Sequence, residues 1–210
     1  MKNNDRYTVP VDEGYEPGLN NSVLKNYFGI KSKDIMENLE EHELERTETE
    51  LLKIYDEQHQ FTAQDICNIH ELWLGDIYPF AGRYRTVNME KDGFPFAAAE
   101  RIQSLMDEFE TKYLNTHTPC HYTDVNELAY SLGVVHVEFI LIHPFREGNG
   151  RTARLLADLM ATQAKMPPLN YDFIDQNKNL ANFKQYILAI HAGLDGNYEP
   201  MKNIFDVLLK

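Results

Sequence analysis

The sequence is poor in cysteine and in long apolar runs. Its 210 residues include two cysteines, Cys67 and Cys120, which lie far apart and form no CxxC pair, so we expect buried free thiols and no thiolate metal site. No uncharged apolar run reaches the ~20 residues that span a bilayer. The first residues also lack the apolar segment of a secretory signal. We therefore expect a soluble, cytoplasmic protein without a membrane partner.

Positive charge is also scarce. The chain carries 20 Lys and Arg against 33 Asp and Glu, which gives a formal net charge of -13. This charge repels the phosphate backbone of nucleic acids, and no dense cluster of Lys and Arg offsets it. We therefore expect no nucleic-acid partner. The length and the 43% hydrophobic content are sufficient for one compact domain with its own core.

Helical periodicity dominates the chain after an irregular lead-in over residues 1–22. One segment, 82–96, instead has β-favouring residues on both sides of Asp92-Gly93, which predicts a hairpin. The expected fold class is mainly α, with one β-hairpin. We expect an N-terminal lead-in and helical extension over 1–60 and a main domain over 61–210, packed as one globular unit. The predicted helices cover residues 32–44, 46–58, 62–77 with Thr62 as N-cap, 97–113, 124–140, 150–164, 179–194 and 201–209.

The segment Ile142–Arg154, IHPFREGNGRTAR, places polar and flexible residues between two apolar runs. A helix predicted to begin near Gly150 presents backbone N–H groups and about half a positive charge at its start. Arg151 and Arg154 lie in this first turn on one side, an unfavourable place for cations unless an anion binds there. The adjoining Gly-Asn-Gly can turn several N–H groups toward one point. The pattern favours a phosphate site over surface arginines at a fraying helix end.

A carboxylate and an imidazole complete this set. Glu147 would repel a phosphate unless a cation lay between them, and Mg²⁺ typically binds one or two carboxylates plus phosphate oxygens. His143 lies across a short loop that Pro144 stiffens and that Phe145 anchors in the core. A histidine with a near-neutral pKa can accept a proton from a hydroxyl. The set is suited to attack of a hydroxyl on a nucleotide phosphorus.

Rival motifs fit the same residues less well. GNGRTA satisfies G-x-G-x-x-A, but IHPFRE separates it from the preceding apolar run and no βαβ units surround it. No GK[ST] follows, so a P-loop is excluded. His136 and Glu138 match the HxE of zinc deaminases, but no PCxxC follows them. We expect His136 to be a helix histidine with a local hydrogen bond.

The segment HPFREGNGRTAR resembles the signature of the Fic family, HPFx[D/E]GNGRxxR, at every fixed position. The resemblance extends from about Phe61 to the C-terminus, and residues 16–30 resemble the lead-in of the bacterial cell-filamentation subgroup. It implies a Fic-type helical bundle whose hairpin is a flap. It also implies transfer of AMP from ATP to a Tyr, Thr or Ser hydroxyl of a target protein, with release of pyrophosphate.

The same resemblance implies a role for each residue of the signature. Gly-Asn-Gly favours AMP transfer, since relatives that phosphorylate carry a signature of the Ala-Asn-Lys type. A nucleotide-binding module without turnover stays an alternative, as do removal of AMP and phosphotransfer at the same site. The implied roles are His143 as general base, Phe145 as anchor, Glu147 as Mg²⁺ ligand, Gly148, Asn149 and Gly150 as anion hole, and Arg151 and Arg154 as ligands of the β- and γ-phosphates of ATP.

The resemblance also bears on partners. In the family the flap holds the extended segment of the target by strand addition, and here Val87, Phe94 and Phe96 are the candidate docking residues. The alternative is that these three side chains make ordinary core contacts. The inhibitory pattern [S/T]xxxE[G/N] finds no match, since Thr8–Gly14 is one residue too long and Ser104–Glu108 lacks the final Gly or Asn. We therefore expect restraint by a separate, small antitoxin-like protein.

Overall fold

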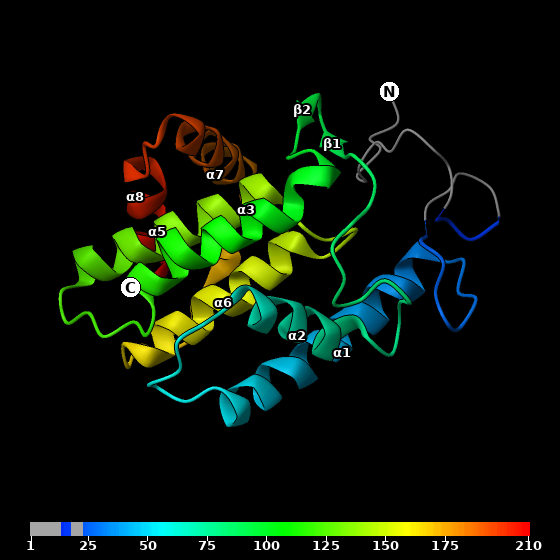
Figure 1. Cartoon of the computed structure of the whole chain (residues 1–210), viewed down its shortest axis with the longest axis horizontal. Helices are drawn as coiled ribbons and strands as arrows, with labels where there is room; N and C mark the ends of the chain where they lie inside the picture. The colour runs from blue at the N-terminus through cyan, green and yellow to red at the C-terminus, as the bar shows by residue number, and fades with distance from the viewer. Residues whose placement is uncertain (1–13, 18–22) are drawn as a thin grey trace.

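The computed structural model describes residues 14–17 and 23–210, so most of the predicted lead-in over 1–22 lies outside the described residues. The described part is mainly helical and contains one two-stranded antiparallel sheet (Figure 1), which confirms the predicted fold class. The helices are α1 (Lys33–Ile54), α2 (Ala63–Leu74), α3 (Ile102–Phe109), α4 (Asn115–His117), α5 (Val125–Ile142), α6 (Asn149–Gln163), α7 (Leu180–Ala192) and α8 (Glu199–Leu208), and the strands are β1 (Glu90–Lys91) and β2 (Phe94–Pro95).

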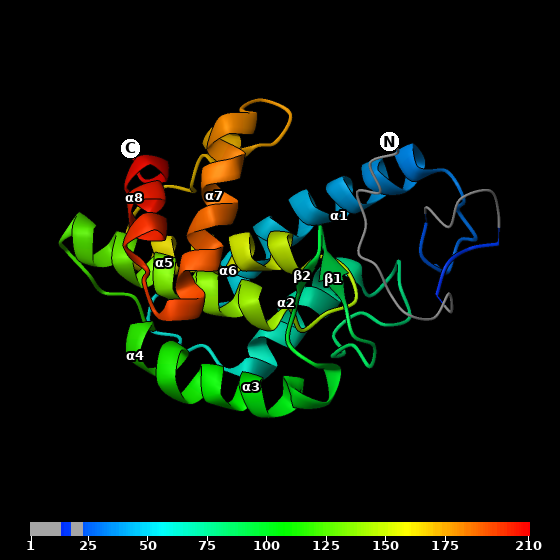
Figure 2. The same cartoon turned by 90° about the horizontal axis from the view of Figure 1, so that it is seen from above.

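Helix α5 is the centre of the bundle. It contacts α3, α6, α7 and α8, which surround it in the two perpendicular views (Figures 1 and 2). Gly133 lets α8 approach closely, because a Cβ there would lie 3.1 Å from the backbone nitrogen of Lys202. Within the described residues α5 is the one helix long and apolar enough to cross a bilayer, and 67% of it is buried inside the protein.

Helix α1 is continuous, so the prediction of two helices over 32–44 and 46–58 is wrong. The junction holds Glu45 and Arg46, which favour helix, and neither Gly nor Pro interrupts the segment. The helix packs against α2 and α6. One of its few buried residues is a carboxylate, Glu40, which is 1% exposed. The predicted N-terminal helical extension therefore contributes a buried carboxylate.

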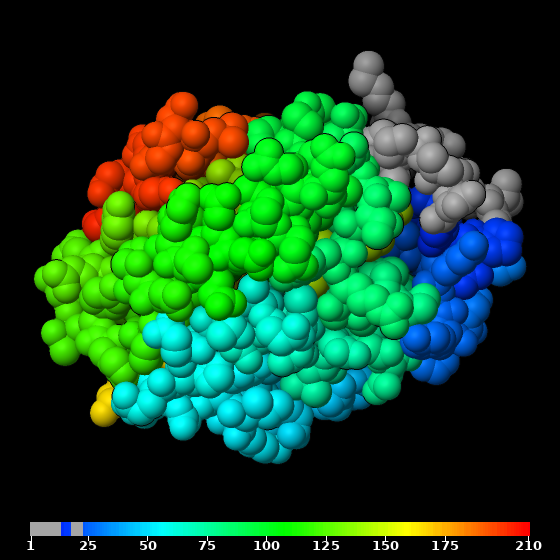
Figure 3. All heavy atoms as spheres, in the orientation of Figure 1, coloured from blue at the N-terminus to red at the C-terminus, as the bar shows by residue number. Residues whose placement is uncertain are grey.

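Two further helices show how local sequence sets their ends. The predicted N-cap of α2 is confirmed: Asp65 N–H donates to the Thr62 hydroxyl at 3.1 Å, and Thr62 N–H donates to the Asp65 carboxylate at 2.9 Å. The helix predicted over 97–113 is less regular. It begins as a 3₁₀ turn before α3 and ends in a π-helical turn. Figure 3 shows the atoms of α3 and of the chain around residues 50–70 meeting on one face.

His136 of α5 makes the stability of this core sensitive to acid. Its ring is 2% exposed, and Nε2 lies 2.8 Å from the hydroxyl of Tyr186 on α7, so it is a helix histidine as predicted, but its hydrogen bond is to a distant helix and not local. Burial, helped by the charge of Arg154, lowers its pKa to about 3. In the unfolded chain the pKa is near 6.5. As the pH falls below about 6.5 the unfolded chain therefore binds a proton that the folded protein does not, and folding loses stability.

Replacing His136 with Gln is expected to remove this acid sensitivity. Between about pH 6 and pH 4, the free energy of unfolding of the wild type should fall relative to the variant by about 1.4 kcal/mol per pH unit. Urea unfolding at several pH values measures this difference. The exposed residue His121 supplies the control, since His121→Gln should parallel the wild type. If the difference in the free energy of unfolding between the wild type and His136→Gln did not change with pH, the acid sensitivity would not come from His136.

Candidate active site

The turn after α5 fixes the protonation state of His143. Helix α5 ends just before Pro144, and His143 takes a left-handed conformation with φ +53°. Its Nδ1 lies 3.1 Å from the carbonyl oxygen of Ile140. Because a carbonyl only accepts, Nδ1 carries the proton and the lone pair of the neutral ring is on Nε2. Burial lowers the pKa of His143 to about 3, below the near-neutral value expected from the sequence, so the ring is neutral at physiological pH. A neutral ring of this tautomer can accept a proton at Nε2.

Asn149 and Phe145 close the loop between α5 and α6. Phe145 N–H donates to Asn149 Oδ1 at 2.8 Å, and Asn149 Nδ2 donates to the Phe145 carbonyl at 2.8 Å. Both residues are 0% exposed. The side chain of Asn149 is thus used within the loop. The groups of Gly-Asn-Gly that could bind an anion are therefore backbone N–H groups of the first turn of α6, which begins with Thr152 N–H donating to the Gly148 carbonyl at 2.9 Å.

His70 of α2 supports this loop from behind, a role that the sequence did not indicate. Gly82 N–H donates to His70 Nδ1 at 2.9 Å, so His70 Nε2 carries the proton and donates to the Glu147 carbonyl at 3.0 Å. The His70 ring also stacks on Phe145, with ring centres 3.9 Å apart. Burial lowers the pKa of His70 to about 4, which keeps this tautomer neutral. His70 thus contacts the loop at the Glu147 carbonyl and at the Phe145 ring.

Gly148 and Gly150 allow a matched test of the loop. Gly148 has φ +80°, and a Cβ there would lie 2.7 Å from the Trp73 ring, whereas a Cβ on Gly150 would meet nothing within 4 Å. Gly148→Ala should therefore lower the free energy of unfolding by about 2 kcal/mol or more. Gly150→Ala should leave stability unchanged or raise it by up to about 1 kcal/mol, because Ala favours helix. Thermal unfolding of both variants measures this; equal losses would contradict the description of the loop.

The two arginines of α6 differ in their partners. Arg151 lies 2.8 Å from Glu40 Oε2 and 3.7 Å from Glu147 Oε1, and its guanidinium carbon lies 4.5 Å from the centre of the Trp73 ring. The hydroxyl of Tyr78 donates to the other oxygen of Glu40. Glu40 therefore orients Arg151 from α1. No local pattern in the sequence indicates this pairing, because it joins the predicted N-terminal extension to the signature.

Arg154 is the cation that remains available. Among the described residues no carboxylate lies within ion-pair distance of Arg154, and its buried Nε has no hydrogen-bond partner. Its guanidinium carbon lies 5.1 Å from the centre of the Tyr171 ring, and the Tyr171 hydroxyl donates to the Arg154 carbonyl at 3.1 Å. A buried donor without an acceptor is costly, and an anionic ligand would satisfy it.

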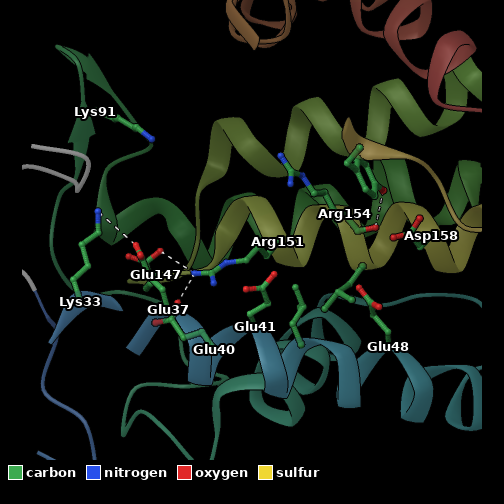
Figure 4. A pocket seen from close by; sticks show the side chains of 13 residues that line it. Lys33, Glu37, Glu40, Glu41, Glu48, Lys91, Glu147, Arg151, Arg154 and Asp158 are labelled. Carbon is green, nitrogen blue, oxygen red and sulfur yellow. Dashed lines mark hydrogen bonds and ion pairs between the residues drawn. The ribbon is translucent and has the colours of Figure 1, made fainter. Parts of the chain in front are cut away.

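A pocket of about 500 Å³ lies between α1 and α6 and contains both arginines (Figure 4). Burial raises the pKa of Asp158, at the far end of this pocket, to about 6. The lining has more carboxylates than cations, so a triphosphate would need an added cation to bind here. The cations are Lys33, Lys91, Arg151 and Arg154, and the carboxylates are Glu37, Glu40, Glu41, Glu48, Glu147 and Asp158.

Glu147 fits a Mg²⁺ ion that arrives with a nucleotide. Its side chain is 15% exposed, and Oε1 accepts from Gly148 N–H at 3.0 Å at the start of α6. Among the described residues no cluster of three His, Cys, Asp or Glu could hold a metal ion without a substrate. Mg²⁺ commonly takes one carboxylate and fills its other positions with phosphate oxygens and water. One carboxylate at a phosphate-binding helix end matches that mode.

The predicted hairpin forms with its turn at Asp92 and Gly93, which have φ +51° and +80°. Val87, Phe94 and Phe96 are all half-buried. The Phe94 ring stacks on His191 of α7, with ring centres 4.5 Å apart. The Phe96 ring stacks on His143, with ring centres 3.7 Å apart and an interplanar angle of 14°. The flap therefore covers His143, which is 4% exposed and is absent from the lining of the pocket.

Comparisons with known proteins agree with this geometry. A sequence model of the Fic/DOC family matches residues 60–161. The chain is 32% identical over 168 residues to "Protein adenylyltransferase VbhT" of Bartonella schoenbuchensis, an alignment that covers 77% of this chain and 31% of that protein. It is 28% identical over 164 residues to "Protein adenylyltransferase Fic" of Nematostella vectensis, covering 76% of this chain and 36% of that protein. The chain thus spans about a third of each relative's length.

Solved structures show the same fold. The BepC protein of Bartonella tribocorum, determined with bound AMPPNP, superposes with a TM-score of 0.71 at 23% identity, covering 88% of this chain and 91% of that chain. The Fic domain of Bep8 from Bartonella sp. 1-1C gives a TM-score of 0.75 at 19% identity, covering 93% and 94%. The family match falls on the segment that carries His143, the Asn149-closed loop and both arginines. Residues 60–161 of this chain therefore form a domain of the Fic/DOC family.

Proposed function

We propose that this chain transfers AMP from ATP to a Tyr, Thr or Ser hydroxyl of a target protein and releases pyrophosphate. The observation that carries the proposal is one short loop that joins two groups: a neutral His143 with its lone pair on Nε2, and the start of α6 with Arg154 lacking an anionic partner among the described residues. The names of VbhT and the Nematostella protein, both protein adenylyltransferases, support it, as does the AMPPNP bound to BepC.

In this reaction each residue has a defined task. His143 Nε2 takes the proton of the target hydroxyl as its oxygen forms a bond to the α-phosphorus of ATP. The bond from that phosphorus to the oxygen of the β-phosphate breaks, and pyrophosphate leaves. Arg151, Arg154 and the first-turn N–H groups of α6 stabilise the charge on the leaving group. Mg²⁺, when bound at Glu147, neutralises phosphate charge.

The flap is proposed as the docking site of the target. In the described residues β1 and β2 pair only with each other, so each strand keeps an edge to which an extended segment can add. Phe96 covers His143, and therefore the target must displace this ring to bring its hydroxyl to Nε2. Val87 and Phe94 would contact the flanking residues of the target.

Labelled ATP tests the proposed reaction. With ATP labelled at the α-phosphate, label should appear on protein; with label at the γ-phosphate, it should remain in pyrophosphate. Label transferred only from the γ-phosphate would make the activity phosphotransfer. ATP binding without any transfer would indicate a nucleotide-binding module. Release of AMP from a pre-labelled target, without the forward reaction, would indicate removal of AMP.

We also propose that a separate, small antitoxin restrains this toxin-like activity in the cytoplasm, where ATP and Mg²⁺ are abundant. The lack of the inhibitory pattern in the sequence supports this. So does Arg154, since an acidic side chain from another protein could occupy the place of the γ-phosphate. Copurification from the native host tests it. A chain that is isolated alone, fully active and harmless to cells would contradict it.

The proposed division of the chain is a lead-in and helical extension over 1–60 and a Fic domain over 61–210, packed as one unit. The packing of α1 on α2 and α6 supports this, as does the contact of Glu40 with Arg151. If the two parts form one unit, they should unfold in a single transition.

A further inference from the structure

A buried arginine joins the flap to the turn that carries His143. Arg85 is 4% exposed, and its side chain donates to four backbone carbonyls. Nε donates to the carbonyl of His143 at 2.7 Å, and Nη1 donates to that of Val87 at 2.7 Å. Nη2 donates to the carbonyls of Ala97 at 2.5 Å and Ile142 at 3.3 Å. One guanidinium thus contacts the segment before the hairpin (Val87), the residue that follows it (Ala97) and the end of α5.

Two further contacts strengthen this connection. The backbone N–H of Arg85 donates to the Pro144 carbonyl at 2.8 Å, so Arg85 contacts three consecutive residues of the turn. Phe96, which precedes Ala97, stacks on the His143 ring. The exit of the flap is therefore fixed to the turn by a hydrogen bond and to the imidazole by a ring contact.

The partners of Arg85 are unusual for a buried cation. Among the described residues no carboxylate forms an ion pair with it, and burial lowers its pKa to about 10, which still leaves it charged at neutral pH. A buried charge without a counter-ion is costly. A carboxylate here would place a negative charge beside His143 and favour a proton on its ring. Carbonyls satisfy the guanidinium without that effect.

We propose that Arg85 is a positioning residue that fixes the spacing between the flap and His143, so that a hydroxyl held by the flap reaches Nε2. The inference rests on the proposed AMP transfer for its consequence in turnover, but the connection itself is a property of the free protein. Lys cannot replace Arg here, because one ammonium group cannot reach four carbonyls that a planar guanidinium contacts together.

Hydrogen exchange tests the connection without any substrate. In Arg85→Lys, amide exchange should become at least about tenfold faster in two segments together, 86–97 and 140–146, which corresponds to about 1.4 kcal/mol of lost protection. Arg83→Lys is the matched control, because Arg83 is exposed and only two residues away; its exchange should equal that of the wild type. Faster exchange in only one segment, or in neither, would overturn the proposal.

Kinetics test the consequence for turnover. Arg85→Lys should lower kcat for AMP transfer by about 100-fold, as expected for a misplacement of about 1 Å, while KM for ATP changes by less than about twofold. A merely structural role would instead lower the amount of active enzyme or raise KM. If Arg85→Lys retained the wild-type kcat, a positive charge alone would be sufficient for turnover, and the proposed positioning role of Arg85 would be wrong. If the wild type itself transferred no AMP, the proposed function would be wrong. The hydrogen-exchange experiment would still test whether Arg85 links the flap to the turn that carries His143.

A measurement on the wild type covers the case in which the variants do not fold. The Arg85 Nε–H resonance, observed by NMR, should exchange slowly with water, with the same protection factor as the Phe96 amide, which donates to the Met89 carbonyl at 3.1 Å. Equal protection factors, each taken relative to the intrinsic exchange rate of that group, would mean that the flap and the turn open in one event. An Nε–H that exchanges at the rate of an exposed arginine would overturn the proposal.

Discussion

His143→Ala is expected to reduce AMP transfer by about 10³-fold or more while leaving the affinity for ATP within about twofold. Loss of a general base typically costs about 10² to 10⁴ in rate. The tautomer of His143 leaves its lone pair on Nε2, whereas the lone pair of His70 accepts from Gly82 N–H. The proposed nucleotide contacts come from α6 and do not involve this side chain. The measurement is the rate of α-label transfer at saturating ATP, with affinity determined by calorimetry.

The control for this variant is His121→Ala, which removes an exposed imidazole and should retain full activity. Thermal unfolding shows whether each protein is folded, because His143→Ala also removes the ring under Phe96. A folded His143→Ala variant that transfers AMP at more than about a tenth of the wild-type rate would rule out His143 as the base.

Arg154→Ala is expected to weaken ATP binding by about 30- to 150-fold. A charge-assisted hydrogen bond to a charged group contributes about 2 to 3 kcal/mol, and among the described residues Arg154 has no carboxylate partner that must be displaced first. Because Arg154 is assigned to the γ-phosphate, affinity for AMP should change by less than about twofold. Calorimetry with ATP and with AMP measures both affinities in one variant.

Arg83→Ala is the matched control, since it removes an exposed arginine outside the pocket and should leave both affinities unchanged. If Arg154→Ala weakened ATP and AMP binding equally, Arg154 would contact another part of the nucleotide or would act through the stability of the fold, and its assignment to the γ-phosphate would be wrong. Unchanged ATP binding in Arg154→Ala would show that Arg154 does not contact the nucleotide.

The signature loop could be predicted because its residues are consecutive in the sequence. A helix start, two glycines and two arginines on one side define a phosphate site without knowledge of distant contacts. The structure adds side-chain contacts that a local sequence pattern does not reveal. The use of the Asn149 side chain within the loop depends on Phe145 turning back over the first turn of α6, and this is visible only in three dimensions.

The residues that support the loop could not be predicted, because each comes from a different element. Glu40 belongs to α1, and its contact with Arg151 follows from the packing of α1 on α6. His70 and Arg85 contact the loop through its backbone carbonyls, which have no side-chain signature in the sequence. Local pattern therefore predicts the groups that are proposed to meet a ligand, and tertiary packing determines the groups that hold them.

The hairpin is an intermediate case. Asp92-Gly93 predicts its turn, since both positions need positive φ. The contacts of Phe94 with His191 and of Phe96 with His143 depend on where α7 and the end of α5 lie in the bundle. In this structure Phe94 and Phe96 make ring contacts inside the protein, and under the proposed function a target that binds to the flap would displace the Phe96 ring from His143.

The most direct test of the site is a crystal structure with Mg²⁺ and an ATP analogue that cannot be cleaved between the α- and β-phosphates. The β- and γ-phosphates should lie over the start of α6 within hydrogen-bond distance of Arg154, with Mg²⁺ on Glu147. The α-phosphate should lie on the side of His143 Nε2. A triphosphate bound in the reverse direction, with its γ-phosphate beside His143, or a pocket that excludes the analogue, would contradict the account.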